Sequence, residues 1–306
     1  MFSNKKVFLL LAAFSTITLQ GQDLDSLMNA MSGEPPDLKV RATFKTTKLV
    51  NMHTIEQVKR GELDFRIAHR FDDIGGQAGG ISTLYGFDNV ADIRISFDYG
   101  LNDRWAIGFG RSKGAHLRRQ LLDFNTKIKL IQQTESGAVP LSMSLYMATE
   151  LSTMRSGSDR LSTTYFTNKF VHRFNYFSQL LLARKFSNSF SAELAPTIVH
   201  RNLVHFNDRN TLFALGAGLR YMFTKRAGII VDYFQVFDEQ RNSGNGFHAP
   251  LGVGLEIETG GHVFHLLFSN NKSLIESQYL TETRDNWLSG QFRFGFNISR
   301  IFNIID

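Results

Sequence analysis

Charged side chains stand at every second position along many segments of this chain, alternating with apolar ones. Positive and negative charges on one polar face can pair with each other and fill a narrow interior, or line a water-filled path and set its selectivity. Both interpretations stay open from the sequence. The charged residues predicted to line an interior are Asp64, Arg66, Asp92, Arg94, Asp98, Arg104, Lys127, Lys129, Glu150, Arg220, Asp232, Glu256, Glu258 and Arg293.

Hydrolytic chemistry has a weaker basis in the sequence. His200 and Asn202 close one apolar segment, and Ser269-Asn270 closes another. A hydrolase needs its nucleophilic hydroxyl within hydrogen-bond reach of the histidine, with a third group that orients the ring. The sequence does not bring these residues together. We therefore predict no catalytic residues and no enzyme, and keep an outer-membrane lipase-type hydrolase as the weakest alternative.

Metal and cofactor sites are not expected. The chain has no cysteine, which excludes thiolate metal sites and disulfides. His262 and His265 flank a turn without the cluster of ligands that zinc needs. The glycine-rich segment 72–80 lacks the Gly-Lys-Ser/Thr that completes a phosphate-binding loop. We expect it to fold back over the mouth of the barrel, or to be a flexible surface loop. Trp287 is expected to anchor at the membrane interface, or to stack on carbohydrate.

The alternating segments have the length and pattern of membrane strands. In 91–101, Ile93, Ile95 and Phe97 alternate with polar residues, Asn102-Asp103 forms a two-residue turn, and the pattern resumes through Lys113. Successive side chains of a strand point to opposite faces. About ten residues suffice for a tilted strand to cross a bilayer. The segment therefore predicts a hairpin with one lipid-facing side.

Counting such segments from Leu63 to Arg300 predicts an all-β fold, an antiparallel up-and-down transmembrane barrel of about twelve strands. Short and long connections alternate, as periplasmic turns and extracellular loops do in outer-membrane barrels. Residues 40–49 form either a further strand, which raises the number to fourteen, or a segment inside the lumen. A soluble sandwich or lipocalin-like barrel is disfavoured, because the face with Asp92, Arg94 and Asp98 cannot be a soluble core.

The N-terminus predicts export. Residues 1–21 have the Lys5-Lys6 n-region and the short apolar run of a signal peptide cleaved near Gly21. Residues 22–39 are expected to form a periplasmic N-terminal segment, and residues 40–306 the outer-membrane barrel. The formal net charge of +6 is spread along the chain, so no basic stripe for nucleic acid is expected.

Two long segments carry a family resemblance. TFKTTKLVNMHTIEQVKRGELDFRIAHRF (43–71) and LYGFDNVADIRISFDYGLNDRWAIGFGRSK (84–113) resemble a domain-of-unknown-function family of outer-membrane β-barrels from Bacteroidetes-type bacteria. LAPTIVHRN (194–202) and GGHVFHLLFSN (260–270) are similar to the same family. The resemblance implies an outer-membrane barrel and no assigned activity, so it contributes no site residues.

These observations lead to a functional expectation in the outer membrane of a Gram-negative bacterium. We expect a porin-like channel or transporter for a small solute, surrounded by outer-membrane lipid. The main alternative is a non-transporting structural or interaction barrel whose long loops meet a partner. No cofactor is expected.

Overall fold

The computed structural model describes residues 37–76, 79–114, 116–166 and 169–305. The chain divides into two units, residues 1–39 and residues 40–306, and all elements named below belong to the second. The predicted signal peptide, and the segment 22–39 up to residue 36, lie outside the described residues.

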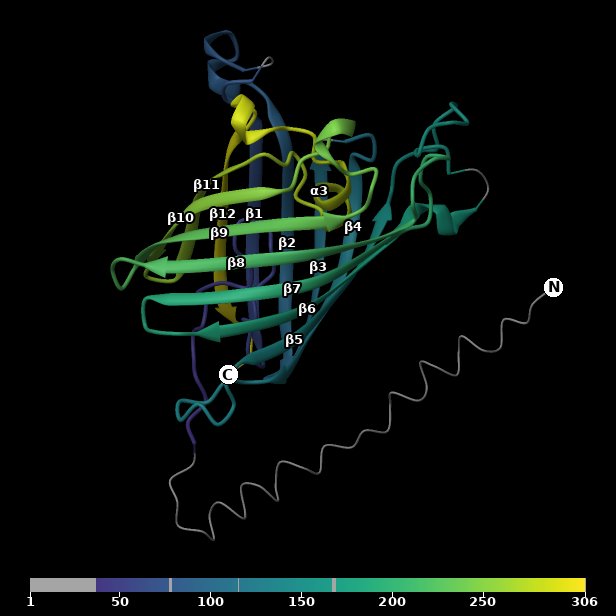
Figure 1. Cartoon of the computed structure of the whole chain (residues 1–306). Coiled ribbons are helices and arrows are strands. Elements are labelled where there is room, and N and C mark those ends of the chain that lie inside the picture. The colour runs from purple at the N-terminus through teal and green to yellow at the C-terminus, as the bar shows by residue number, and fades with distance from the viewer. Residues whose placement is uncertain (1–36, 77–78, 115, 167–168, 306) are drawn as a thin grey trace, which may run out of the picture. The chain divides into compact units, whose positions relative to one another are not determined.

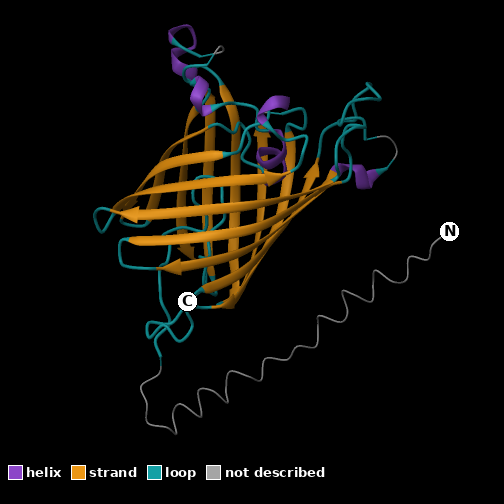
Figure 2. Cartoon of the chain, viewed as in Figure 1, coloured by secondary structure: helices purple, strands orange, loops and turns teal. Residues whose placement is uncertain are grey.

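Twelve antiparallel strands close into one barrel, as predicted (Figure 2). The barrel closes by pairing β1 with β12, from Glu62 opposite Asn303 to Asp73 opposite Arg293. The predicted twelve-strand membrane barrel is confirmed. The strands are β1 Glu62–Asp73, β2 Val90–Asn102, β3 Trp105–Gly114, β4 Gln120–Ile131, β5 Ser142–Ser152, β6 Phe174–Lys185, β7 Phe190–Arg201, β8 Thr211–Met222, β9 Ala227–Phe237, β10 Leu251–Thr259, β11 His262–Ser269 and β12 Arg293–Asn303.

Alternation along the strands separates a lipid-facing surface from an interior. In β2, Ile95 and Phe97 are each 41% exposed, whereas Asp92 and Arg94 on the opposite face are buried. Because successive side chains point to opposite faces, the apolar set faces outward all round the barrel. The outward face suits contact with lipid, and the polar set faces the lumen.

The connections alternate between the two ends of the barrel in the predicted order. At one end lie 103–104, 132–141, 186–189, 223–226 and 260–261, and at the other lie 74–89, 115–119, 153–173, 202–210, 238–250 and 270–292. The end with longer loops is the outer end, since outer-membrane barrels have short periplasmic turns. Four short 3-10 helices and one α-helix, α3 Glu276–Glu282, lie in these outer connections.

No helix in the described part of the chain is long and apolar enough to cross a membrane.

Residues 40–49 do not form a thirteenth strand, so the fourteen-strand alternative is wrong. Instead, residues 43–58, named here the N-terminal plug, are buried inside the barrel, with Leu49 and Met52 fully buried. Hydrogen bonds from Leu49 N to Met52 O (2.8 Å) and from Thr54 N to Thr47 O (3.0 Å) close a tight loop. A barrel already closed by β1 and β12 has no free edge to which another strand could pair.

Glycines of β8 make room for this plug. A Cβ added at Gly218 would lie 2.5 Å from Cε of Met52, and one at Gly216 would lie 2.9 Å from its sulfur. Such distances are far shorter than van der Waals contact. Glycine at these two positions lets the plug approach the wall backbone closely.

A second segment enters the lumen from the outer end. Residues 270–285 of the β11–β12 connection, named here the outer plug, include α3, whose residues 276–281 are buried. Figure 1 shows α3 among the strands near the end with the long loops. Two segments therefore fill the interior of the barrel. The N-terminal plug precedes β1, and the outer plug lies between β11 and β12.

Candidate functional site

Acidic side chains of the wall hold the backbone of the N-terminal plug. The Asp232 carboxylate on β9 accepts hydrogen bonds from Asn51 N (2.5 Å) and Met52 N (2.8 Å). The Glu193 carboxylate on β7 accepts one from Ile55 N (2.7 Å). An irregular buried segment needs partners for its amides, because an unpaired buried donor is costly. These two wall acids supply such partners.

Basic side chains satisfy the plug carbonyls in the same way. Nζ of Lys127 on β4 donates to the carbonyls of Thr54 (2.9 Å) and Glu56 (2.8 Å). The Arg70 guanidinium on β1 donates to Val50 O at 2.9 Å. The wall charges therefore do more than pair with each other, since several of them bind the plug main chain directly.

One side of the wall meets the plug with apolar side chains instead. Leu49, Met52 and Ile55 belong to an apolar cluster with wall residues drawn mainly from β5 to β9. Phe234 of β9, for example, is fully buried, and its ring centroid lies 5.5 Å from that of Tyr279 in the outer plug. This cluster joins both plugs to the same side of the barrel.

The outer plug is also anchored by wall acids. Leu274 N donates to Asp92 on β2 (2.9 Å), and Ser277 N donates to Glu150 on β5 (2.9 Å). Glu150 also accepts a hydrogen bond from the side chain of Asn175 on β6 at 3.2 Å. Asp92 and Glu150 thus bind main-chain amides of the outer plug. Asp232 and Glu193 bind main-chain amides of the N-terminal plug in the same way.

The two plugs meet at one buried carboxylate. Glu276 of α3 binds Lys48 Nζ at 2.7 Å and His53 Nε2 at 2.9 Å, and both belong to the N-terminal plug. Burial alone would raise the pKa of Glu276, but the Lys48 charge and the His53 hydrogen bond lower it well below its usual range. Burial, reinforced by Lys48, lowers the pKa of His53 well below its usual range. The junction therefore contains an ionised glutamate, a lysine and a neutral histidine.

Little space remains along the lumen once both plugs are in place. Two internal cavities, one beside Arg94 and one beside Lys127, measure about 10 Å³ each. A cavity of that size has room for about one water molecule. Among the described residues, the larger space is a pocket of about 370 Å³ at the outer end, named here the mouth pocket.

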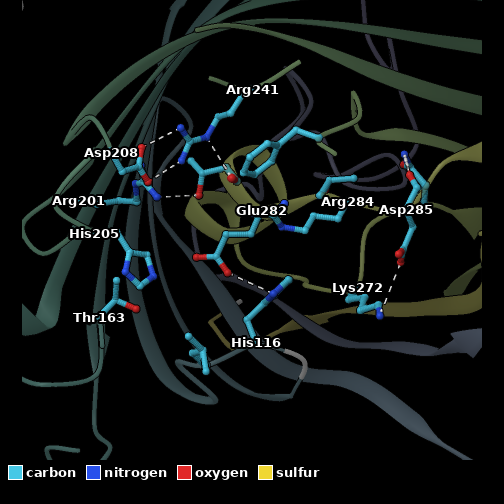
Figure 3. Close-up of a pocket in the computed structure, with 15 residues that line it drawn as sticks. His116, Thr163, Arg201, His205, Asp208, Arg241, Lys272, Glu282, Arg284 and Asp285 are labelled. Atoms are coloured by element: carbon cyan, nitrogen blue, oxygen red, sulfur yellow. Dashed lines mark hydrogen bonds and ion pairs between the residues drawn. The ribbon is translucent and has the colours of Figure 1, made fainter. Parts of the chain in front are cut away.

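Five outer connections and the end of β7 line the mouth pocket (Figure 3). Asp208 accepts hydrogen bonds from both terminal nitrogens of Arg241 (2.8 and 2.7 Å) and from Arg201 (3.0 Å). Burial would raise the pKa of Asp208, but these two arginines lower it. His116 lies 3.1 Å from Glu282, and burial lowers its pKa. The pocket is therefore polar, charged and largely pre-formed.

The predicted lumen residues occupy three kinds of place. Ten of the fourteen are buried: Asp64, Arg66, Asp92, Arg94, Lys127, Glu150, Arg220, Asp232, Glu256 and Arg293. Asp98, Lys129 and Glu258 are half-buried. Arg104 is exposed in the turn between β2 and β3 and lines no interior, so the prediction fails there. It follows the turn residue Asp103 instead of continuing a strand, so the alternation does not reach it.

Several buried charges pair within the wall. Arg220 lies 2.8 Å from Glu256, and Arg66 lies 3.0 Å from Asp64. Arg94 pairs with Asp123 at 2.6 Å, a partner absent from the predicted set. Arg70 and Glu193 were also missed, although both continue the inward positions of their strands. Glu276 gave no strand-like signal, because it begins the short helix α3 inside a strand connection.

His200 does not meet Ser269. Ser269 faces the lumen, where it is fully buried and bonded to Asn271, whereas half-buried His200 contacts Thr211 (2.8 Å) and Asn202 (3.1 Å). His200 alternates with the buried Val199 and Arg201 of β7 and so lies on the outer face of the wall, whereas Ser269 lies on the inner face of β11. The serine that the hydrolase alternative required is out of reach of this histidine.

The structure also gives the surroundings of Trp287 and of the glycine-rich segment. Trp287 donates its indole N–H to Leu251 O (3.0 Å) and stacks on Phe292, with ring centroids 4.8 Å apart, so its broad face is covered on one side by protein. The described residues of the glycine-rich β1–β2 connection do not line the mouth pocket, and Ile81 is 77% exposed. That connection is anchored beside β12 by Ile74 N to Phe292 O (2.9 Å) instead of covering the mouth.

The described part of the chain contains no cluster of three or more histidine, aspartate or glutamate side chains able to hold a metal ion.

These features define a class: a membrane β-barrel with a lipid-facing apolar surface and a filled polar lumen. The chain belongs to the family described as membrane bound beta barrel domain (DUF5777), whose model matches residues 44–302. The match includes the N-terminal plug from residue 44 onward, eleven complete strands and β12 up to Phe302. The protein is an outer-membrane barrel, since membrane-spanning barrels of this type are outer-membrane proteins.

Three solved outer-membrane barrels resemble this chain in fold at low sequence identity. The KdgM porin is 11% identical, with a TM-score of 0.46 over 79% of this chain and 99% of the porin. An outer membrane channel from Pseudomonas putida F1 is 11% identical, with a TM-score of 0.47 over 81% and 98%. Outer membrane phospholipase A from Escherichia coli is 10% identical, with a TM-score of 0.44 over 84% and 96%. No curated protein matches by sequence.

Proposed function

We propose that the protein is a gated channel for a small polar solute, held closed by the N-terminal plug and the outer plug. The observation that carries this proposal is the way in which the plug is held. Asp232, Glu193 and Lys127 bind its main chain through hydrogen bonds that water can replace when the segment leaves. Both partners of each of these bonds are polar, so neither is left unpaired when water fills the lumen.

The barrel wall supports the same proposal, because it does not depend on the plug for closure. All twelve strands are hydrogen-bonded to two neighbours, including β1 with β12. Residues 59–61 connect the plug to β1 at the periplasmic end, so the plug can move while the strand stays in place. A solute would enter through the mouth pocket and pass once both plugs are displaced.

The test is conductance in planar lipid bilayers. The full-length protein is expected to be closed most of the time. A variant lacking residues 43–58 is expected to open more often and for longer, because the outer plug has then lost the Lys48 and His53 partners of Glu276. An Asp232→Ala, Glu193→Ala double variant keeps the segment but removes two carboxylates that accept hydrogen bonds from it. This variant should open more often than the parent protein. A refolded deletion variant and a double variant that both stay closed at all voltages would contradict the proposal.

A second candidate is a permanently closed barrel whose outer loops bind a protein partner. The observation in its favour is the apolar surface at the outer end, where Ile81 is 77% exposed, Phe206 is fully exposed and Leu288 is 96% exposed. Such a barrel would stay silent in the bilayer with or without residues 43–58. The same conductance measurement therefore separates the two candidates.

A further inference from the structure

Most charges in the mouth pocket neutralise each other. Asp208 is bound by Arg241 and Arg201, and its side chain is only 16% exposed. Asp285 is bound by Arg293 and has a side chain 14% exposed, with Lys272 more distant at 3.8 Å. A ligand in the pocket would find these two carboxylates already hydrogen-bonded.

The charges that remain accessible have an excess of positive sign. The side chain of Lys272 is 38% exposed, that of Glu282 is 39% exposed, and Arg284 is classed as exposed. His116 beside Glu282 is neutral at pH 7, because burial lowers its pKa. The accessible charges among the described residues of the pocket are therefore two cations, Lys272 and Arg284, and one anion, Glu282.

Arg284 is held in position without an acidic partner. Its guanidinium carbon lies 3.9 Å from the ring centroid of Phe247, and its nearest hydrogen-bond acceptor is Asn245 O at 3.4 Å. No carboxylate of the described chain pairs with it. A guanidinium presents five N–H donors in a fixed plane, and stacking on an aromatic ring leaves its edge free. The edge of Arg284 is therefore a ready donor to an anionic group (Figure 3).

We propose that the mouth pocket binds a small polar solute that carries one anionic group, a carboxylate or a phosphate. Arg284 and Lys272 bind the anionic oxygens, while Glu282, His205 and Thr163 bind hydroxyls on the rest of the molecule. The volume of about 370 Å³ lies within the range of roughly 300–1,000 Å³ typical of small-molecule sites. The inference rests on the proposed function, because it names the substrate class of the same channel.

The position of the pocket connects binding with the closed lumen. Seven of its fifteen lining residues belong to the outer plug: Asn270, Lys272, Thr281, Glu282, Thr283, Arg284 and Asp285. A bound anion would therefore contact the segment whose Glu276 meets the N-terminal plug. The two cations assigned to the anion, Lys272 and Arg284, are both on that segment.

Isothermal titration of the full-length protein in detergent micelles tests the inference with three related six-carbon probes. The probes are gluconate, glucose 6-phosphate and uncharged glucose. Gluconate or glucose 6-phosphate is expected to bind about tenfold more tightly than glucose, because charge-assisted hydrogen bonds are the stronger ones. The ratio between the two anions shows whether the site prefers a carboxylate or a phosphate.

Two variants show whether the binding is at this site. Arg284→Gln is expected to weaken anion binding about tenfold and to leave glucose binding unchanged. Lys225→Gln, in the exposed turn between β8 and β9 at the opposite end, is the matched control and should bind like the parent. Equal affinity for glucose, absence of binding by both anions, or full affinity in Arg284→Gln would each overturn the inference.

Binding and conductance fail independently. If the anions bind but deletion of residues 43–58 never opens the barrel, the channel proposal falls and the anion site stands. If the deletion variant conducts but Arg284→Gln changes no affinity, the channel proposal stands and the anion site falls.

Discussion

The two sides of the inner wall differ in how they hold the N-terminal plug: both supply polar partners, but only one adds most of an apolar cluster. The side formed by β10–β12 and β1–β4 presents ionised and amide side chains, such as Arg70, Asp92 and Lys127, whereas β5–β9 add Phe177, Leu181 and Phe234 to the apolar cluster. Neighbouring positions of β9 show both modes, since Asp232 binds plug amides and Phe234 packs in the cluster. The comparison teaches that directional bonds fix the position of the plug, while apolar contact supplies much of its stability.

The largest effect is expected on the apolar side. Phe234→Ala removes a fully buried ring that packs on Tyr279, and such truncations cost about 3–5 kcal/mol. Hydrogen exchange followed by mass spectrometry should show faster exchange in residues 43–58 and in α3 together. Val253→Ala, on the lipid-facing side of β10, is the control. Exchange that rises in only one of the two plugs would mean that the cluster does not join them.

Asp232→Ala, two residues away on the same strand, is expected to loosen only the N-terminal plug. It leaves the amides of Asn51 and Met52 without their acceptor, at a cost of about 3 kcal/mol, which corresponds to exchange about a hundredfold faster. α3 should keep its protection. If α3 loosens equally, the polar and the apolar contacts of β9 do not act on the two plugs separately.

Glu276→Gln should have a smaller effect in both plugs, about 1–2 kcal/mol, because the amide keeps the shape but loses the charge that faces Lys48 and His53. A double-mutant cycle with Lys48→Met measures the coupling by hydrogen exchange. Replacing both charged groups by apolar ones can be neutral for a buried pair. If both plugs exchange as slowly in the Lys48→Met, Glu276→Leu variant as in the parent, the ion pair does not stabilise the closed lumen. It then only determines which residues of the two plugs meet.

Acidification should loosen the junction through His53. Its pKa lies well below the usual value in the closed state, so a released His53 binds a proton more readily than a buried one. Closure is then fully stable above about pH 6.5 and weakens as the pH falls below that value. The charges of Lys48 and Lys127 lower the pKa of His53 further, whereas Glu276 raises it. The Tyr146 ring stacks on the imidazole.

The measurement is hydrogen exchange of residues 43–58 at pH 7 and pH 5, after correction for the intrinsic dependence of exchange on pH. His53→Gln should lose the greater part of the pH effect, while His116→Gln in the mouth pocket should keep it. An unchanged response in His53→Gln would assign the effect to other groups.

The smallest effect is expected at Arg104. This residue is exposed in a turn, so Arg104→Gln should change protection of the plug by less than about 0.5 kcal/mol. Lys127→Gln is the matched charge removal inside the lumen and should release the carbonyls of Thr54 and Glu56. Equal effects from the two variants would mean that the lumen charges do not seat the plug.

The strands were predictable because a period of two residues is written locally in the sequence. The same alternation placed Asp232 and Glu256 inward. In β1 it also places Arg66 and Ala68 inward, and the next inward position after Ala68 is Arg70. The N-terminal plug was only one of two alternatives, since its segment is irregular and its hydrogen-bond partners lie far along the chain. Ile55 and Glu193, for example, are 138 residues apart. Such pairing follows from the closed barrel and from no local pattern.

The mouth pocket was out of reach of sequence analysis for a related reason. Its lining comes from loops between five pairs of strands, and loop residues carry no periodic signal. His200 shows the opposite failure, in which local sequence suggested a site that the facing of two strands excludes. Alternation predicts on which face of the sheet a side chain lies. It does not predict which loop residues contact that side chain.

The pairing of β1 with β12 has a consequence for the order of assembly. These strands are the first and the last of the barrel, so the wall closes only when the whole chain is present. The N-terminal plug is joined to β1 by residues 59–61 and is already at hand when the last strand arrives. A sheet that curls around this segment has a template for its inner face, and pairing between distant strands is the slow step of such folds. The segment that fills the finished barrel therefore precedes all twelve strands along the chain, and the strand that completes the wall is the last.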